Sequence, residues 1–382
     1  MLSRLVDKRY PIGSSGYSGV LVSFVLVSLF ALVACNTSRS SSTAGTSSNQ
    51  IIGAGSTFIY PVMTRWINAF QTTHPGVQIN YQSIGSGGGI QQLKKGLVDF
   101  GASDAALDDQ QLKEMPPLVQ IPESAGPVCI TYNLPQLKSP LKLSANTLAG
   151  IYLGTINNWR DAAIKKDNPS VTLPNDAIVV AHRSDGSGTT NIFTNYLAKV
   201  SPEWAKKVGN GIAVKWPAGI GGKGSEGVTA VVKETPGGIG YVELTYANEN
   251  NLPVAAIRNQ SGHWIEPSAA ATTATINAFA DQLAKDVREP IIDPPASAKD
   301  AYPIAGLTFL LVPKQGKYPN RTNTLRQFIE YIVTQGQDTA ETLFYAKLPA
   351  SLQQQDQALL SQLGTEGQHV HAQLKPATGV TR

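Results

Sequence analysis

Three short segments of the chain place glycine beside serine or threonine directly before a predicted helix. They are residues 53–58 (Gly-Ala-Gly-Ser-Thr-Phe), 85–89 (Gly-Ser-Gly-Gly-Gly) and 183–190 (Arg-Ser-Asp-Gly-Ser-Gly-Thr-Thr). Glycine lets the backbone come close to a ligand, and the first turn of a helix offers free N–H groups with a partial positive charge. One such loop is usually only a turn and a helix cap. Three in one chain predict a site for an anion.

Two charged residues sharpen this hypothesis. Arg183 opens the third segment, where a forked guanidinium among other donors favours a bidentate oxyanion ligand over a solvated surface arginine. Asp104 follows Gly-Ala-Ser at the end of a predicted strand. It is either the cap of a helix that begins near Asp108 or a hydrogen-bond acceptor inside the anion site.

Motifs for other chemistries are incomplete. No lysine follows these glycines, so the nucleotide-binding P-loop is missing. Phe58 occupies the place of the third glycine of a dinucleotide-binding fingerprint, and Ala105 replaces the last glycine of a nucleophile elbow. The five histidines are scattered, and His369 and His371 near the end of the chain do not make a metal motif. We therefore expect no catalytic residue, no cofactor and no metal.

The segments must be positioned by alternating strands and helices. The first elements are expected as a strand at 51–52, a helix over 62–70, a strand at 77–81, a helix face with Ile90, Leu93 and Leu97, and a strand at 98–102. This alternation predicts a parallel sheet with crossover helices, whose ligands gather at the carboxyl ends of the strands. Later strands are expected at 118–121, 128–132, 178–181, 239–242 and 308–312, with helices around 192–197 and 325–332.

The composition supports an α/β fold with two domains. The 382 residues are 42% hydrophobic and 15% charged, with 35 Gly and 24 Pro, which provides sizeable cores and many turns. The formal net charge is only +4 and the basic residues form no tract. We therefore expect no nucleic-acid partner.

The N-terminus has the pattern of a signal peptide. Arg4, Lys8 and Arg9 precede an apolar run over 20–33, which is short for a membrane span. The sequence Leu-Val-Ala-Cys ending at Cys35 resembles a bacterial lipobox, in which the cysteine is acylated. An uncleaved anchor helix and an ordinary cleavage nearby are the alternatives. We predict a lipoprotein signal peptide over 1–34 and a lipidated Cys35.

The two cysteines are not expected to form a disulfide. If Cys35 carries lipid, Cys129 has no partner. Cys129 lies in an apolar strand-like run and is predicted to be a buried, inert thiol. Residues 36–49 are almost entirely Ser, Thr, Gly, Asn and Ala, so we assign 35–50 to the lipidated cysteine and a flexible tether that precedes the folded part.

Six segments together resemble the phosphate-binding proteins of high-affinity phosphate ABC transporters. The likeness runs in unchanged order from about residue 51 to about residue 349, apart from roughly 259–301. The six segments are 53–58, 99–104 (Asp-Phe-Gly-Ala-Ser-Asp), 150–154 (Gly-Ile-Tyr-Leu-Gly), 183–189, 216–217 (Trp-Pro) with 221–224 (Gly-Gly-Lys-Gly), and 239–243 (Ile-Gly-Tyr-Val-Glu).

The resemblance implies a fold and a domain division. It implies an α/β, two-lobed periplasmic-binding-protein fold of the type II-like class. Each lobe would be a mixed β-sheet flanked by helices, with the ligand in the cleft. Lobe I would comprise 51–132 plus 303–364 and lobe II 133–302, followed by a C-terminal tail over 365–382.

The resemblance also assigns a phosphate site. Asp104 would accept the proton that phosphate still carries, and Asp185 would hold the fork of Arg183. His182 stands where some relatives have a second arginine, and Gly87 stands where some have serine. The predicted phosphate-binding residues are Thr57 through its hydroxyl, Phe58 through its N–H, Ser86, Asp104, Arg183, Ser187, Gly188 and Thr189.

The function implied is capture of inorganic phosphate and its delivery to membrane-embedded ABC permease subunits. The protein would be a monomer without enzymatic activity, lipid-anchored in the periplasm or on the outer face of the cell membrane. Three alternatives remain: a binding protein for another oxyanion such as sulfate or molybdate, an extracellular phosphatase, and a phosphate sensor. Asp104 argues against fully ionised oxyanions, and the lack of a nucleophile–base pair argues against the phosphatase.

Overall fold

The structure is a computed structural model that describes residues 50–364. The predicted signal peptide, Cys35, most of the tether and the tail lie outside these residues. Among the helices of residues 50–364, none has both the length and the apolar character that a membrane crossing requires.

Strands and helices alternate through most of the described chain. The strands are β1 (Gln50–Gly55), β2 (Gln78–Ser83), β3 (Phe100–Ser103), β4 (Leu118–Tyr132), β5 (Lys142–Leu143), β6 (Val179–Arg183), β7 (Ile220–Gly222), β8 (Gly238–Glu243), β9 (Ala256–Arg258), β10 (Trp264–Ile265) and β11 (Ala305–Pro313). The helices are α1 (Tyr60–Thr73), α2 (Ser86–Lys94), α3 (Asp109–Lys113), α4 (Ala145–Tyr152), α5 (Ala162–Asp167), α6 (Gly188–Val200), α7 (Pro202–Lys207), α8 (Gly224–Glu234), α9 (Leu244–Glu249), α10 (Ala269–Ala278), α11 (Ala280–Lys285), α12 (Pro319–Val333), α13 (Gly336–Thr342) and α14 (Ala350–Leu360).

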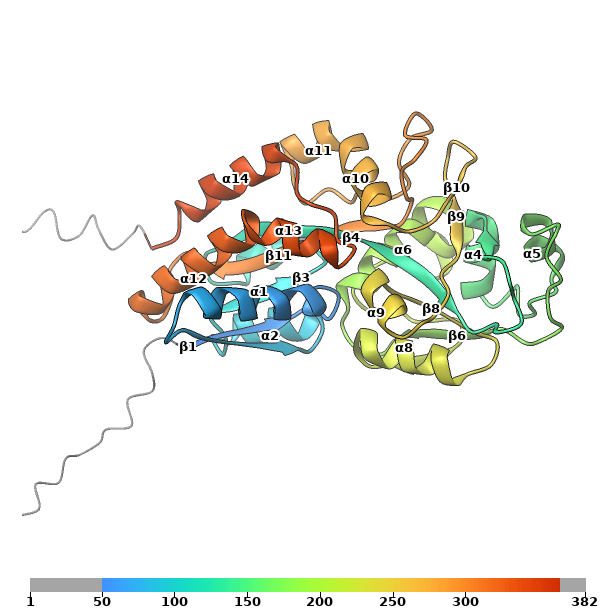
Figure 1. Ribbon diagram of the computed structural model, residues 1–382, viewed down its shortest axis with the longest axis horizontal. Helices are drawn as coiled ribbons and strands as arrows, with labels where there is room; N and C mark the ends of the chain where they lie inside the picture. Colours follow the sequence, from blue (N-terminus) through green and yellow to red (C-terminus); the bar gives the residue numbers. More distant parts are fainter. Residues whose placement is uncertain (1–49, 365–382) are drawn as a thin grey trace, which may run out of the picture. The chain divides into compact units, whose positions relative to one another are not determined.

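One large mixed sheet organises the fold. Its strand order is β2-β1-β3-β11-β4-β8-β6-β7 (Figure 1). Strands β1, β2 and β3 pair in parallel, as the sequence predicts, while β11 pairs antiparallel with both β3 and β4. We call β2, β1, β3 and β11 the first part of the sheet and β8, β6 and β7 the second part.

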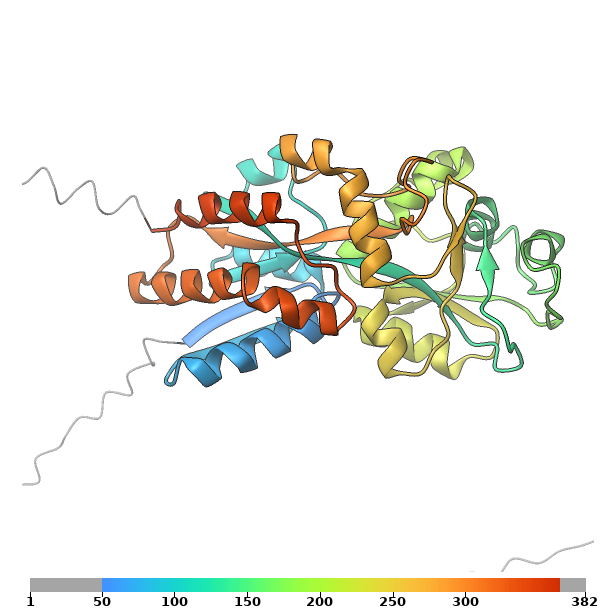
Figure 2. The same cartoon turned by 45° about the horizontal axis from the view of Figure 1, so that its top comes forward.

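Strand β4 belongs to both parts of the sheet. Its residues from Leu118 to Pro127 pair with β11, and those from Val128 to Tyr132 pair with β8 (Figure 2). The sequence predicts two strands here, at 118–121 and 128–132, and this is wrong. The intervening residues stay extended because β11 pairs with them through a shift in register at Thr308.

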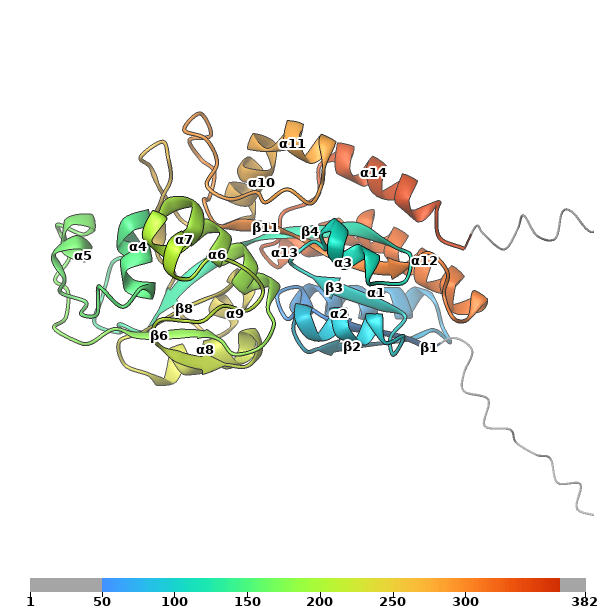
Figure 3. The ribbon, with the colours of Figure 1, turned by 180° about the vertical axis from the view of Figure 1, so that it is seen from behind.

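Helices cover both parts of the sheet. Figure 3 shows α2 and α3 beside the first part, and α4, α6 and α7 beside the second. Helix α1 buries the apolar face that its spacing predicts, including Trp66 and Phe70. The predicted helix face that includes Leu97 is too long, since α2 ends at Lys94 and Leu97 is 62% exposed. Gly96, with φ of 64°, turns the chain out of the helix.

The second part carries a small additional sheet with the order β10-β9-β5. Helices α10 and α11 fall in the region 259–301, where the resemblance was absent. Cys129, on β4, is fully buried and its thiol donates to the Val242 carbonyl at 3.2 Å. This confirms the prediction of a buried thiol.

Candidate anion-binding site

Four helix N-termini meet where the two parts of the sheet face each other. Helices α1 and α2 follow β1 and β2 of the first part, and α6 and α8 follow β6 and β7 of the second. Each helix has at least nine residues, so each offers several N–H groups and a partial positive charge at its start. The sequence predicted three of these four starts. Hydrogen bonds between them define the site.

The starts of α2 and α6 share the Ser86 hydroxyl. The backbone N–H of Asp104 donates to Ser86 Oγ at 3.3 Å, and the N–H of Gly188 donates to the same oxygen at 3.1 Å. A Cβ added at Gly188 would lie 2.6 Å from the Asp104 Cβ and 2.7 Å from Ser86 Oγ. The contact therefore requires glycine at position 188.

The starts of α1 and α8 meet through Thr57 and Ser225. Their hydroxyl oxygens are 2.8 Å apart, and the Ser225 N–H donates to Thr57 Oγ1 at 3.2 Å. The Tyr246 hydroxyl, from α9, donates to the Thr57 carbonyl at 2.6 Å. Thr57 is thus held by two residues of the opposite part of the sheet.

Asp104 lies at the centre of these donors. Its side chain accepts hydrogen bonds from the Ser56 hydroxyl and, at 3.3 Å, from the Thr189 hydroxyl. Only 4% of the residue is exposed. Burial raises the pKa of the Asp104 carboxyl to about 6, against the lowering effects of the Ser56 hydrogen bond and the Arg183 charge. Asp104 is not the cap of the following helix, because Asp108 caps α3.

Arg183 and Asp185 form a forked ion pair. Arg183 Nε donates to Asp185 Oδ1 at 2.8 Å, and Nη2 donates to Oδ2 at 2.5 Å. The Gly224 N–H, at the start of α8, also donates to Asp185 Oδ1 at 3.0 Å. Burial lowers the pKa of Arg183, but the Asp185 carboxylate outweighs this effect and the pKa is raised. The pair fixes the guanidinium and leaves Nη1 outside the fork.

Gly85 allows the second loop to lie against this ion pair. Its φ is 83°, in the region that favours glycine, and an added Cβ would lie 3.2 Å from Arg183 Nη2. Next to it, the Gly87 N–H donates to the Gly186 carbonyl at 2.9 Å, and an added Cβ at Gly87 would lie 3.0 Å from the Gly186 Cα. The glycine at 87 therefore permits a close backbone contact that a serine would crowd.

The predicted site residues do not all make contacts with one another. Two of them make hydrogen bonds elsewhere. The Ser187 hydroxyl caps α6 by accepting a hydrogen bond from Thr190 N–H at 3.0 Å, and the Phe58 carbonyl accepts one from the Tyr345 hydroxyl at 2.6 Å. His182 stacks on Trp216 with ring centroids 5.0 Å apart. All eight predicted residues are buried: Thr57, Phe58, Ser86, Asp104, Arg183, Ser187, Gly188 and Thr189. Hydrogen bonds bring Ser86, Asp104, Gly188 and Thr189 into one cluster.

Sequence reasoning missed several side chains that support this cluster. Ser56 lies within a glycine-rich segment that resembles the family, and Ser225 directly follows another. Their position at the start of a helix could have identified both as site residues. No sequence pattern identified Tyr246. Glu123, on β4, is fully buried, and burial followed by the Asp104 charge raises the pKa of its carboxyl well above the ordinary value. Glu123 is thus a second buried acid that interacts electrostatically with Asp104.

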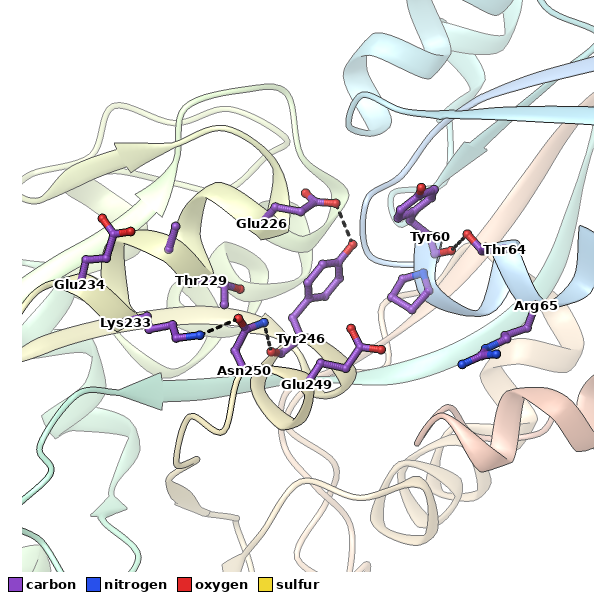
Figure 4. A pocket seen from close by; sticks show the side chains of 12 residues that line it. Tyr60, Thr64, Arg65, Glu226, Thr229, Lys233, Glu234, Tyr246, Glu249 and Asn250 are labelled. Carbon is purple, nitrogen blue, oxygen red and sulfur yellow. Dashed lines mark hydrogen bonds between the residues drawn. The ribbon is translucent and has the colours of Figure 1, made fainter. Parts of the chain in front are cut away.

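A separate hollow of about 720 Å³ lies on the far side of Tyr246 (Figure 4). It is lined by the start of α1, with Tyr60 and Arg65, and by residues of α8 and α9. The Tyr246 hydroxyl bonds Glu226 at 3.1 Å on this side and the Thr57 carbonyl at 2.6 Å. Tyr246 therefore lines this hollow and also contacts Thr57 of the candidate site.

The donors of this arrangement suit an anion. Within residues 50–364 no group of three or more His, Cys, Asp or Glu is placed to hold a metal ion. Helix starts, hydroxyls and a fixed guanidinium are the usual ligands of oxyanions.

Comparison with known proteins supports this assignment of chemistry. The family model described as a PBP superfamily domain matches residues 40–335. The chain is 43% identical over 324 residues to the phosphate-binding protein PstS of Xylella fastidiosa (strain Temecula1), which covers 85% of this chain and 88% of that protein. It is 41% identical over 315 residues to the phosphate-binding protein PstS of Pasteurella multocida (strain Pm70), with 82% and 90% covered.

A solved structure shows the fold. The phosphate-binding protein from Stenotrophomonas maltophilia is 20% identical, has a TM-score of 0.63, and covers 81% of this chain and 93% of that chain. The predicted α/β periplasmic-binding-protein fold is thereby confirmed.

Proposed function

The chain belongs to the phosphate-binding protein PstS family of the PBP superfamily, and from this premise we propose that it captures inorganic phosphate and delivers it to an ABC importer. The observation that carries the proposal is the buried Asp104 carboxyl among the donors of two opposed helix starts. The relatives of this chain are named for phosphate binding. The proposed ligands are the eight residues predicted from the sequence.

Each donor has a defined part in the proposal. The hydroxyls of Thr57 and Ser86 and the N–H groups at the start of α6 would surround the phosphate oxygens. Arg183 would add a charge-assisted hydrogen bond, since Asp185 holds its fork in place. Ser187 would contribute chiefly by capping α6.

Asp104 would select phosphate over sulfate. Near neutral pH phosphate keeps at least one proton and sulfate keeps none. The Asp104 carboxylate can accept a hydrogen bond from the protonated phosphate oxygen. Opposite sulfate, the carboxylate would face a lone pair and a second negative charge. A buried polar group left unpaired costs about 1–3 kcal/mol, and more when it is charged. Sites of this kind can reject an analogue by ~10⁴–10⁵.

We further propose that the chain forms two lobes, 51–132 plus 303–364 and 133–302, which close on the ion. Strand β4 supports this division, because its partner changes from β11 to β8 at Val128. The bonds between Ser86 and Gly188 and between Thr57 and Ser225 join residues of opposite lobes. Closure excludes water and strengthens each hydrogen bond. A radius of gyration unchanged by phosphate would contradict this hinge.

The protein is proposed to be anchored to a membrane through its N-terminus. Cys35 would carry lipid and hold the protein in the periplasm or on the outer face of the cell membrane, as a monomer. The permease would receive the ion there. Mass spectrometry of the exported protein tests the lipid, because acylation adds a defined mass to the peptide that contains Cys35.

The central test is titration of the purified protein, stripped of bound anion, with phosphate and then with sulfate. We expect tight binding of phosphate and weak or unmeasurable binding of sulfate. Equal affinity for both would support another oxyanion instead. Turnover of a phosphomonoester would contradict a role in binding alone. A sensor would bind phosphate equally well, so loss of phosphate uptake on deletion separates a carrier from a sensor.

A further inference from the structure

One end of the first part of the sheet carries a cluster of cations around two exposed apolar side chains. This end is where β1 begins and where α12 begins (Figure 1). We call the cluster the tether-end patch. Its members are Leu97, Lys317, Tyr318 and Arg321, which line one hollow, together with Lys94, Lys95 and Lys314, which are next to hollow-lining residues in the sequence.

The apolar part of the patch borders a hollow of about 420 Å³. Ile52 of β1, Leu97 and Tyr318 line this hollow together with Lys317 and Arg321. Leu97 is 62% exposed and Tyr318 is 45% exposed. Large apolar side chains that project this far from a folded surface commonly mark a site of interaction.

The charge of the patch departs from that of the rest of the fold. Residues 50–364 hold 25 Lys and Arg against 25 Asp and Glu and are formally neutral. The patch contributes five cations, and the carboxylates beside it are Asp99 and Glu114. Glu114 bonds Lys94 at 2.8 Å, and Asp99 is 3.8 Å from Arg321. An excess of positive charge therefore remains at this end.

The cations and the aromatic ring are interleaved. The Arg321 guanidinium lies 4.3 Å from the centre of the Tyr318 ring, and Lys317 Nζ lies 5.6 Å from it. Exposed tyrosine with adjacent Lys and Arg is the combination found at the boundary between water and lipid headgroups.

The path of the chain places this end nearest to the predicted lipid. Only residues 36–49 separate Cys35 from Gln50, the first residue of β1. At full extension a segment of this length reaches only ~50 Å. An anchor at Cys35 would thus hold the start of β1, and with it the patch, close to the membrane.

We propose that the tether-end patch docks on a bilayer surface that contains anionic phospholipids. Lys95, Lys317 and Arg321 would contact the phosphate-bearing headgroups, while Leu97 and Tyr318 enter the interfacial layer. The patch is a second membrane contact beside the predicted lipid, and two weak contacts together give stable attachment where one does not. This inference uses the predicted anchor but does not depend on which anion the protein binds.

The anion site stays uncovered in this arrangement. The site lies at the carboxyl end of β1, beyond Gly55, whereas the patch surrounds the opposite end of the same strand near Gln50. Docking of the patch is therefore expected to leave phosphate affinity unchanged.

Vesicle binding by the chain from residue 36 onward, which lacks both the apolar run over 20–33 and the cysteine predicted to carry lipid, tests the proposal. The probes are vesicles of phosphatidylcholine alone and of phosphatidylcholine mixed with phosphatidylglycerol. We expect sedimentation with the mixed vesicles at low salt and little binding to the neutral ones. Each cation near an anionic surface contributes roughly fivefold in affinity, so Lys95→Ala with Lys317→Ala should weaken binding about 25-fold.

A matched control removes the same charge elsewhere. Lys165 and Lys166 are exposed on α5, in the second part of the fold, and their double alanine variant should bind mixed vesicles as the parent does. An equal loss of vesicle binding in both double variants would show a general effect of charge and would overturn the proposal. So would equal binding of the parent to both kinds of vesicle, or no binding to either.

A second measurement locates the contact. Mixed vesicles should slow amide hydrogen exchange in the segments around Leu97 and Tyr318 and leave the α5 segment unchanged. Protection elsewhere, with none at these two segments, would assign membrane contact to another surface. Calorimetry with phosphate confirms that each variant is folded.

Discussion

The backbone N–H of Gly188 donates to the Ser86 hydroxyl at 3.1 Å, although the two residues are 102 positions apart in the sequence. The bond joins the start of α6 to the start of α2 and so joins the two parts of the sheet. The same hydroxyl accepts from Asp104 N–H. The proposed site exists in this form only while these helix starts are in contact.

We expect Gly188→Ala to weaken phosphate binding by roughly 10²-fold or more. The added methyl would lie 2.6 Å from the Asp104 Cβ and 2.7 Å from Ser86 Oγ, so the helix starts would have to separate and lose several hydrogen bonds. Calorimetry measures the affinity. Gly101→Ala is the matched control, because an added Cβ there meets its nearest atom at an ordinary 3.4 Å. Wild-type affinity in Gly188→Ala would show that the contact is not needed.

Asp104→Asn is expected to relax discrimination between phosphate and sulfate by roughly 10²-fold or more, while the fold is kept. The amide can donate to sulfate and no longer presents a negative charge to it. It also loses the charged acceptor for the phosphate proton. Competitive titration with both ions measures the ratio of affinities. An unchanged ratio would remove Asp104 from the proposed mechanism.

The same carboxyl predicts a dependence of selectivity on pH. Burial raises the pKa of Asp104 to about 6 in the unliganded site. Above this pH the carboxylate accepts from phosphate and repels sulfate, and below it the protonated group can donate to sulfate. Selectivity for phosphate should therefore fall as pH falls through about 6. In Asp104→Asn the selectivity for phosphate should not change with pH and should equal that of the parent protein at low pH. If selectivity falls equally with pH in both proteins, another group is responsible.

Asp356 predicts a dependence of stability on pH. It is fully buried on α14, both carboxyl oxygens lack a hydrogen bond within residues 50–364, and burial raises its pKa to about 8. Between about pH 4 and pH 8 the native state keeps this proton while the unfolded state releases it. The free energy of unfolding should therefore decrease as pH rises through this window, by several kcal/mol, on the order of 3–5.

Asp356→Asn should remove the contribution of Asp356 to the slope and leave those of the other buried acids with raised pKa, Asp104, Glu123 and Glu243, as measured by denaturant unfolding at a series of pH values. The asparagine amide does not titrate, so its burial changes the free energy of unfolding by the same amount at every pH. Asp281→Asn, at an exposed position on α11, serves as the control and should keep the parent's slope. An unaltered slope in Asp356→Asn would mean that the carboxyl is solvated in the native protein.

Local patterns in the sequence were sufficient for the parts of the site that depend on neighbouring residues. The segment 53–58 precedes α1 as predicted, because turn and cap preferences act over a few residues. Residues 86–89 and 188–190 instead form the first turns of α2 and α6, so these two helices begin earlier than the sequence predicts. The fork between Arg183 and Asp185 also spans only two positions, but it was expected from the family resemblance and not from a local pattern. The predicted end of α2 was wrong because Leu97 fits the helical spacing but follows Gly96.

Only the tertiary structure decided how these pieces meet. Ser225 reaches Thr57 across 168 positions, and the first part of β4, from Leu118 to Pro127, pairs with a strand almost 200 residues later. Glu123 becomes a second buried acid that interacts electrostatically with Asp104 only once that sheet has formed. The sequence determines which groups can bind an anion, because their chemistry is local. Their convergence is a property of long-range packing, which no short-range pattern records.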